Sequence, residues 1–364
     1  MPGRQLINQH IFRKEMETTK HTPTALPEGI KALLHRGVVI PAHPLVLQPG
    51  KKSIDEEAQK ALTRYYVNSG AGGVAVGVHT TQFEIRDKTF SLFEPVLKTV
   101  AEAIDELALP APFIKIAGIC GDTRQAVSEA ETALKYGYHM GLLSMGGLSG
   151  YSEEQLLDRV RAVAAVIPVF GFYLQPAVGG RILSYDFWRQ FAEIPGVLAI
   201  KIAAFNRYHT IDVVKAVCHS SRRDEIALYT GNDDNIIPDL LTPYRFTIDG
   251  AVVEKVFVGG LLGHWAFCTE HAVQVLKEVK QCVDSGYKGV ENLLAKGIEV
   301  TDTNAAVFDV ANNFHGCIAG IHEMLRREGL MTNTACLLEK EVLSPGQLKK
   351  IDDICTRYFP LLMS

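Results

Sequence analysis

The chain has 364 residues, of which 47% are hydrophobic and 21% are charged, a composition typical of a globular protein with a large buried core. Its formal net charge of -4 offers no basic surface to nucleic acid or to an acidic membrane, so we expect a small-molecule partner. The seven cysteines are scattered without a Cys-x-x-Cys pair, which is typical of reduced thiols in a cytoplasmic protein.

The N-terminal 35 residues are mixed and polar, and we interpret them as a leader that packs on the surface or is partly mobile. They lack the apolar core of a signal peptide. A run without charges at 162–180 is long enough to raise a membrane span, but Pro168, Gly171, Pro176 and Gly179-Gly180 interrupt it. We interpret this run as the end of a helix, a buried strand and a loop.

From Gly37 onward, short apolar runs alternate with longer helical patterns, which indicates repeated βα units and a parallel sheet. The strands are expected at 37–41, 73–78, 112–118, 140–144, 169–173, 198–203, 226–230 and 252–258. Helices are expected at 54–68, 123–136, 152–164, 186–192, 210–218 and 264–279, several of them opened by a Ser, Thr or Asp suited to an N-cap. Eight βα units in about 250 residues fit an α/β fold of the (β/α)8 TIM barrel type.

The competing fold is a doubly wound sheet, which places a glycine fingerprint after its first strand and an acidic residue about 20 positions later. The glycine-rich residues 69–73 instead precede an expected strand, so we interpret them as a turn. Beyond Cys282, helical segments at 289–296, 305–329 and 344–358 have no strands between them. We therefore expect a leader at 1–35, a TIM barrel at 36–282 and a helical C-terminal region at 283–364.

Lys201 is the one charged residue in the apolar run Val197-Leu-Ala-Ile-Lys-Ile-Ala-Ala-Phe-Asn206. Side chains alternate along a strand, so Ile200 and Ile202 facing the helices would leave Ala199, Lys201 and Ala203 facing the barrel interior. Two flanking alanines leave room for a covalent substrate, and burial lowers the pKa of an amine toward the nucleophilic form. The structural alternative is a lysine that reaches a strand end or pairs with a carboxylate, as Lys115 and Lys255 in other expected strands could.

Tyr173 is the second candidate. If Phe170, Phe172 and Leu174 face outward, Val169, Gly171 and Tyr173 face inward, and Tyr173 lies one strand before Lys201 near the C-terminal ends of the strands, where barrel enzymes keep their chemistry. A phenol beside an imine-forming lysine can transfer protons to the carbinolamine and to a substrate hydroxyl. The alternative is an aromatic residue at a strand end with its hydroxyl in water.

Several ordered segments from about Gly37 to the end resemble the dihydrodipicolinate synthase and N-acetylneuraminate lyase family of class I aldolases. They are Gly37-Val-Val-Ile-Pro-Ala-His-Pro44, Thr80-Thr81, Ile116-Ala-Gly-Ile119, Phe172-Tyr-Leu-Gln-Pro-Ala-Val-Gly-Gly180, Ile200-Lys-Ile202 and Gly231-Asn-Asp-Asp234. The resemblance implies that Lys201 forms an imine with pyruvate or another 2-oxo acid, that Tyr173 relays protons, and that Thr80 and Thr81 hold the carboxylate. It also implies a homo-oligomer, a tetramer or a dimer, with no cofactor and no metal.

The departures from the family's pattern concern the loops. Gln82 and Phe83 replace a glycine and a glutamate after the two threonines, and His79 replaces the glycine before them. Val178 stands where synthases of the lysine precursor carry an arginine, and Met145-Gly-Gly-Leu148 stands where they carry a tyrosine of the proton relay. These losses argue against lysine biosynthesis. His79, Val178, Gly180 and Gly231 remain candidate substrate contacts.

Other readings stay open at this point. Arg86 or Arg181 could supply a compensating cation, although a lone loop arginine is more often solvated. The sequence contains neither a His-x-His nor a His-Glu-x-x-His motif, which a metal-dependent hydrolase would usually have. Asp233-Asp234 could bind a cation or stabilise a helix N-terminus. The same imine could also serve a 2-keto-3-deoxy sugar acid dehydratase, and an inactive family member acting as a binding or assembly protein is the alternative from another class.

Overall fold

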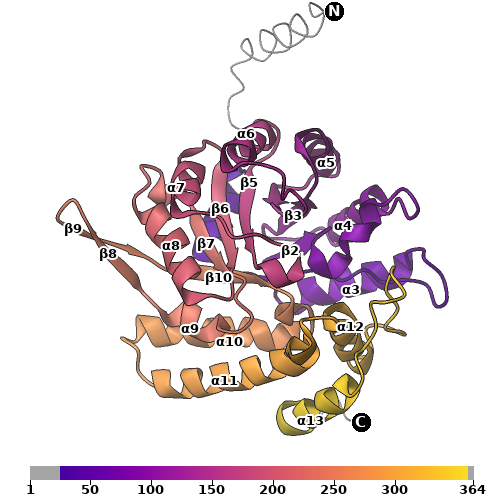
Figure 1. The fold of residues 1–364 in the computed structure, drawn as a ribbon. Coiled ribbons are helices and arrows are strands. Elements are labelled where there is room, and N and C mark those ends of the chain that lie inside the picture. The colour runs from indigo at the N-terminus through magenta and orange to yellow at the C-terminus, as the bar shows by residue number, and fades with distance from the viewer. Residues whose placement is uncertain (1–24, 360–364) are drawn as a thin grey trace, which may run out of the picture.

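The structure is a computed structural model that describes residues 25–359. Eight parallel strands form one sheet in the order β1-β10-β7-β6-β5-β4-β3-β2 (Figure 1). Their bounds are β1 Val39–Pro41, β2 Gly73–Val76, β3 Ile114–Ile119, β4 Met140–Leu143, β5 Val169–Leu174, β6 Val197–Ala203, β7 Ala227–Thr230 and β10 Phe257–Leu262. A parallel bridge between Ala42 and Ala75 joins the two ends of this order. The expected TIM barrel is confirmed.

The helices follow the strands around the outside of the barrel (Figure 1). Their bounds are α3 Glu56–Asn68, α4 Phe93–Asp105, α5 Thr123–Lys135, α6 Glu153–Ala164, α7 Tyr185–Glu193, α8 Arg207–Cys218, α9 Ile236–Leu241 and α10 Thr269–Asp284. In α3 the buried positions 59, 62, 63 and 66 recur at helical spacing, so one face packs on the sheet. The expected polar caps are present, since the side chains of Asp55, Asp122, Ser152 and Ser184 each accept a backbone N–H at the start of a helix.

Helix α2, Glu28–Arg36, covers the end of the barrel where the strands begin. Its buried Leu33 and Leu34 belong to the same apolar cluster as the inward side chains of the strands, and Tyr229 of β7 donates from its hydroxyl to the Leu34 carbonyl oxygen at 2.8 Å. This part of the expected leader is therefore packed against the barrel. Residues 1–24 of the expected leader lie outside the described residues.

The expected strand at 252–258 is wrong. Residues Tyr244–Ile248 (β8) and Ala251–Lys255 (β9) form an antiparallel hairpin that projects from the barrel (Figure 1), and the eighth barrel strand is β10. The turn is Asp249-Gly250, both residues with positive φ, which is the strongest short hairpin signal in a sequence. The apolar run at 252–258 thus combines the end of a hairpin with the start of a barrel strand.

The expected helical C-terminal region is present and, within the described residues, contains α11 Val290–Val307, α12 Cys317–Arg327 and α13 Gln347–Tyr358. Helix α11 runs well past the expected segment 289–296, and α12 is shorter than the expected segment 305–329. Figure 1 shows α11 running beside α10 on one side of the barrel, with α12 and α13 following it. The interpretation of residues 162–180 is also confirmed, because α6 ends at Ala164 and β5 follows, with a short turn of helix at Pro176–Val178. Within residues 25–359, no helix is long and apolar enough to cross a membrane.

Candidate active site

A cavity of about 60 Å³ lies at the C-terminal ends of the barrel strands, between them and the C-terminal helices. Its polar side chains are His79, Thr80, Gln175, Lys201 and Asp233. The other lining residues are small or apolar: Ala42, Val78, Phe172, Leu174, Val178, Ala203, Phe205, Gly231, Gly263, Phe308, Phe314, Cys317 and Ile321. A water needs about 10–15 Å³ of such space, so the cavity accommodates roughly four to six waters or a molecule of similar size.

Lys201 faces this cavity, as the strand pattern predicts. Its neighbours Ala199 and Ala203 also face the barrel interior, whereas Ile200 and Ile202 pack with the surrounding helices. Burial lowers the pKa of the Lys201 amine to about 8, although the nearby charge of Asp233 acts in the opposite direction. A larger fraction of this amine than of an ordinary lysine is therefore in the nucleophilic, uncharged form near neutral pH.

Gly231 provides the space that the lysine occupies. A Cβ atom at this position would lie 2.5 Å from Cε of Lys201 and 2.9 Å from Cβ of Ala203. Both distances are too short for carbon atoms that are not bonded. The absence of a side chain at the end of β7 is therefore what allows the lysine to extend into the cavity.

The expected orientation of Tyr173 is wrong. Phe172 pairs with Lys201 in the register of β5 and β6, and the Lys201 amine lies 4.5 Å from the centroid of the Phe172 ring. Tyr173 points the other way, stacked on Trp188 of α7 and His209 of α8. Phe170, Phe172 and Leu174 face inward, so β5 alternates as expected but in the opposite phase.

The paired threonines have different environments. Thr80 lines the cavity, and its buried Oγ1 has no hydrogen-bond partner among residues 25–359. Thr81 does not line the cavity: its Oγ1 donates to the His43 carbonyl oxygen at 2.6 Å and accepts the Gly77 N–H at 2.9 Å. Only Thr80 is thus free to bind a ligand through its hydroxyl, while Thr81 fixes the loop.

The loop that carries the threonines is tied to the C-terminal region. Gln82 has a left-handed φ of 68°, a conformation that glycine adopts most readily, and its side-chain oxygen accepts the Leu337 N–H at 2.6 Å. His79 at the start of this loop lines the cavity, and burial lowers its pKa to about 4. His79 is therefore uncharged near neutral pH.

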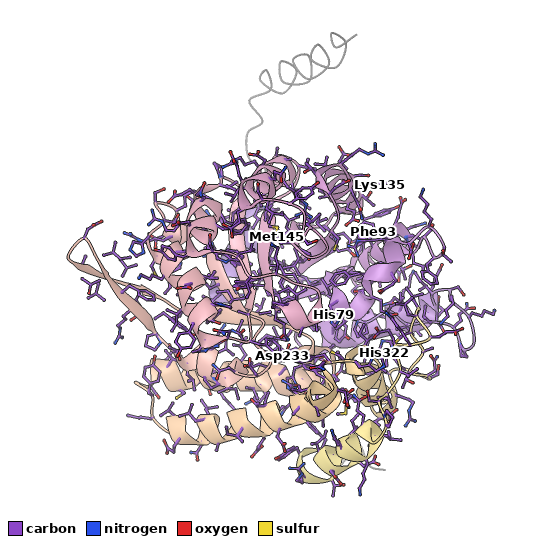
Figure 2. The ribbon with its side chains drawn as sticks, viewed as in Figure 1. His79, Phe93, Lys135, Met145, Asp233 and His322 are labelled. Carbon is purple, nitrogen blue, oxygen red and sulfur yellow. The ribbon has the colours of Figure 1, made fainter. Side chains whose placement is uncertain are left out.

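Asp233 brings a carboxyl group to the cavity. Burial raises its pKa to about 7, although the Lys201 charge acts in the opposite direction. Its loop is fixed by Asn304 of α11, whose side-chain nitrogen donates to the Asp233 carbonyl oxygen at 2.7 Å and whose side-chain oxygen lies 2.7 Å from Nδ1 of His264. Figure 2 shows Asp233 and His79 on the side of the barrel that faces the C-terminal helices. The pair Lys201 and Asp233 thus joins an amine and a carboxyl group that both titrate near neutral pH.

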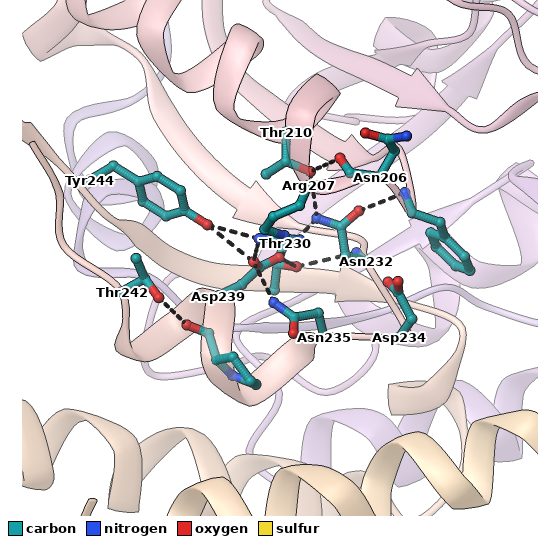
Figure 3. A network of polar contacts seen from close by, with 12 residues as sticks. Asn206, Arg207, Thr210, Thr230, Asn232, Asp234, Asn235, Asp239, Thr242 and Tyr244 are labelled. Carbon is teal, nitrogen blue, oxygen red and sulfur yellow. Dashed lines mark hydrogen bonds and ion pairs between the residues drawn. The ribbon is translucent and has the colours of Figure 1, made fainter. Parts of the chain in front are cut away.

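A buried network behind this loop is centred on Asp239 of α9 (Figure 3). The Asp239 carboxylate accepts hydrogen bonds from Thr230 at 2.7 Å and from Asn232 at 2.8 Å, and it pairs with Arg207. The Asn232 side-chain oxygen in turn accepts the Phe205 N–H at 3.0 Å. One carboxylate therefore fixes both the loop after β7, which carries Gly231 and Asp233, and the residue that follows β6.

Of the remaining candidate contacts, one lines the cavity and the others do not. Val178 lines the cavity, whereas Gly180 does not; a Cβ at Gly180 would lie 1.8 Å from the Leu174 carbonyl oxygen, so its role is to let two backbone segments approach. Arg86 is buried against Glu129 at 2.9 Å, and Arg181 donates to the carbonyl oxygens of Leu148 and Tyr151 at 3.0 and 3.1 Å. Neither arginine lines the cavity.

Sequence reasoning missed the contribution of the C-terminal region to the site. Phe308, Phe314, Cys317 and Ile321 reach the cavity from the end of α11, the following turn and α12. Phe314 packs edge to face on Phe205, with ring centroids 5.9 Å apart. No spacing pattern predicts this contact, since the two residues lie more than a hundred positions apart.

In the part of the chain that the structure describes, no group of three or more His, Cys, Asp or Glu side chains could hold a metal ion.

Residues 45–251, more than half of the chain, match the model of the dihydrodipicolinate synthetase family. The chain belongs to this family. The resemblance inferred from the sequence motifs is confirmed. The matched region includes Lys201, Thr80 and Asp233, and it ends before the C-terminal helices that complete the cavity.

Two curated relatives are both named 4-hydroxy-tetrahydrodipicolinate synthase. The protein of Acaryochloris marina is 28% identical over 153 residues, which are 42% of this chain and 48% of the relative. The protein of Thiobacillus denitrificans is 25% identical over 190 residues, 52% of this chain and 60% of the relative. The chain therefore spans about half the length of the curated relatives that it matches.

Solved structures support the fold over a longer span. Dihydrodipicolinate synthase from Oceanobacillus iheyensis superposes with a TM-score of 0.69 at 15% identity, covering 90% of this chain and 98% of that one. N-acetylneuraminate lyase from Fusobacterium nucleatum, solved in complex with pyruvate, gives a TM-score of 0.68 at 15% identity and covers 91% and 99%. At these identities the likeness extends to the fold alone.

Proposed function

We propose that the protein is a class I aldolase of the lyase type, in which the amine of Lys201 forms an imine with pyruvate or a close 2-oxo acid. The observation that carries this proposal is the position of Lys201: a buried amine with a lowered pKa faces the cavity beside a carboxyl group that titrates near neutral pH. Membership of the dihydrodipicolinate synthetase family supports it.

The chemistry needs no redox step. The neutral Lys201 nitrogen attacks C2 of the 2-oxo acid, and the carbinolamine loses water to give an imine. Removal of a C3 proton gives an enamine, whose C3 attacks the carbonyl carbon of an aldehyde while the new alkoxide takes up a proton. Water then hydrolyses the imine, which frees Lys201 and the product. Cleavage is the reverse path, in which the C3–C4 bond breaks as the C4 hydroxyl loses its proton.

Thr80 is suited to hold the carboxylate of the 2-oxo acid. Its buried hydroxyl oxygen lines the cavity and has no partner among the described residues, and buried polar groups in folded proteins are normally paired. A substrate carboxylate oxygen could accept a hydrogen bond from this hydroxyl. Thr81, which the sequence placed in the same role, has its hydroxyl engaged by the His43 carbonyl oxygen instead.

Asp233 is suited to transfer the protons that the sequence assigned to Tyr173. A general acid or base works best when its pKa lies near the operating pH, and burial brings the pKa of Asp233 into that range. In its neutral form it can protonate the leaving hydroxyl of the carbinolamine. In its charged form it can accept the C3 proton, so the same group serves both halves of the reaction.

Hydrogen exchange at the substrate tests this proposal without knowledge of the second substrate. An enamine takes up deuterium at C3 when it is protonated in heavy water, so the enzyme should remove the methyl signal of pyruvate from a proton NMR spectrum. Lys201→Ala should exchange at the rate without enzyme. If the wild-type protein exchanges neither pyruvate nor 2-oxobutyrate faster than buffer, the proposal is wrong. A cytoplasmic location and a tetrameric or dimeric assembly remain predictions from the sequence.

A further inference from the structure

The cavity has five polar side chains in a lining that is otherwise small or apolar. The polar side chains are Lys201, Asp233, Thr80, His79 and Gln175. Val178 and the contacting rings of Phe205 and Phe314 supply apolar surface, which we call the apolar end. Apart from Lys201, no lysine or arginine of the described chain lines the cavity, and His79 is uncharged near neutral pH because burial lowers its pKa to about 4. The 2-oxo acid places its own carboxylate near Thr80 and Lys201. A second carboxylate would have no cation to pair with.

The apolar end is built from segments far apart in the chain. Phe205 follows β6, Phe314 precedes α12, and their rings contact each other. Both residues have positive φ, 48° and 65°, a backbone conformation that is costly for bulky side chains. Such outliers persist where the surroundings enforce them, and they concentrate at ligand sites.

Hydrogen bonds hold the backbone at each of the two phenylalanines. The N–H of Phe205 donates to Asn232, which belongs to the network around Asp239 (Figure 3). The turn before Phe314 is fixed by Asp309, whose carboxylate accepts from the Asn312 side chain at 2.7 Å and from the Gly316 N–H at 3.1 Å. The aromatic pair is therefore positioned by hydrogen bonds on both sides rather than by chance packing.

We infer that the second half of the substrate, the aldehyde that joins C3 of the 2-oxo acid, is small, uncharged and apolar. This inference rests on the proposed function and specifies its substrate class. An apolar aldehyde would place its carbonyl carbon toward the enamine and its alkyl group against Phe205, Phe314 and Val178. A charged aldehyde would bury a carboxylate against phenyl rings, and an unpaired buried charge is strongly unfavourable.

The test compares two small branched aldehydes that differ in charge. Isobutyraldehyde and glyoxylate differ in that one carries a branched methyl pair where the other carries a carboxylate. The enzyme is incubated with pyruvate and each aldehyde. The rate of aldol formation is then divided by the rate at which the same enzyme exchanges deuterium into pyruvate. We expect kcat/KM for isobutyraldehyde to exceed that for glyoxylate at least about 100-fold.

A charge-introducing variant makes the test reciprocal. Val178→Arg places a cation at the partly exposed edge of the apolar end, and its ratio of the two rates should shift toward glyoxylate by at least tenfold. Wild-type preference for glyoxylate, or equal rates, would overturn the inference, and so would an unchanged ratio in Val178→Arg. Exchange at pyruvate does not involve the aldehyde. If exchange is observed in these cases, the proposed function therefore stands although the inference fails. Loss of exchange in the wild-type protein would overturn both.

Discussion

The amine of Lys201 lies 4.5 Å from the centre of the Phe172 ring, and the two residues are register partners across β5 and β6. The side chain opposite the lysine is therefore a phenyl ring, which carries no transferable proton. A ring face attracts an ammonium group, so the lowered pKa of Lys201 comes from burial and not from this contact. In the proposed reaction, proton transfer falls to another group of the cavity, and Asp233 is the group we propose for it.

Tyr173→Phe should leave catalysis nearly intact. The tyrosine ring stacks on Trp188 and His209 outside the barrel interior, and the substitution keeps that ring. We expect turnover of pyruvate exchange to stay within about threefold of wild type, far from the ~10²–10⁴-fold loss of a general acid. Measurement of kcat together with the melting temperature checks this. A loss of turnover beyond 100-fold with an unchanged melting temperature would return Tyr173 to the mechanism.

Asp233→Asn should slow exchange by about 10²–10⁴-fold, because it removes the proposed general acid and base. It should also move the pH profile. The Asp233 charge raises the pKa of Lys201, so its removal lowers that pKa and shifts the midpoint of imine formation below the wild-type value of about 8. Rates of imine formation measured from pH 6 to 10 report this shift.

The control for Asp233 is its neighbour. Asp234 is exposed and does not line the cavity, so Asp234→Asn should change neither the rate nor the midpoint by more than about twofold. Equal losses in the two variants would indicate that the loop needs negative charge in general. In that case Asp233 would have no specific part in proton transfer.

Gly231→Ala should displace the lysine. The added Cβ would lie 2.5 Å from Cε of Lys201, and a misplacement of about 1 Å at a reacting group costs up to about 100-fold in rate. We expect at least a tenfold loss of exchange, with a small change in melting temperature since the lysine side chain can move away. Gly150→Ala is the matched control, because a Cβ there meets no atom within 4 Å. Similar rates for the two variants would show that the lysine does not need the space at Gly231.

Dihydrodipicolinate synthase activity should be weak or absent. Val178 lines the cavity without offering a cation, and aspartate semialdehyde carries both a carboxylate and an ammonium group. A coupled assay with pyruvate and aspartate semialdehyde measures this activity. A turnover near the enzyme median of about 10 per second would contradict the expectation and the apolar end of the cavity together.

The barrel could be predicted because its signals are local. Alternating apolar strands, helical periods and N-cap residues each occupy a short window. The inward position of Lys201 follows from strand alternation once Ile200 and Ile202 are assigned to the helix side. The side on which Tyr173 lies could not be obtained this way, since alternation does not say which of two phases faces inward. The phase depends on which set packs against the helices, and Tyr173 stacks on Trp188 and His209 while Phe170 and Phe172 face inward.

The parts of the site that escaped prediction are those formed by long-range contacts. The sequence places Asp233 in a family-like segment and leaves it open as a cation ligand or a carboxylate at a helix N-terminus, but it gives no sign that burial near Lys201 brings its pKa close to neutral. Phe314 reaches the cavity through a turn with several left-handed residues in the C-terminal region. Thr81 matched a family motif as well as Thr80 did, but the hydrogen bond of its hydroxyl to the His43 carbonyl oxygen removes it from the cavity.

Reductive trapping tests the central assignment most directly. The protein is incubated with pyruvate and borohydride, which reduces an imine to a stable secondary amine, and peptide mass mapping then locates the modified lysine. We expect the adduct on Lys201 and its loss in Lys201→Arg. An adduct confined to Lys115, which pairs with Asp105 at 2.9 Å, or to Lys255, which donates to the Arg223 carbonyl oxygen at 2.6 Å, would contradict the assignment, as would the absence of any adduct.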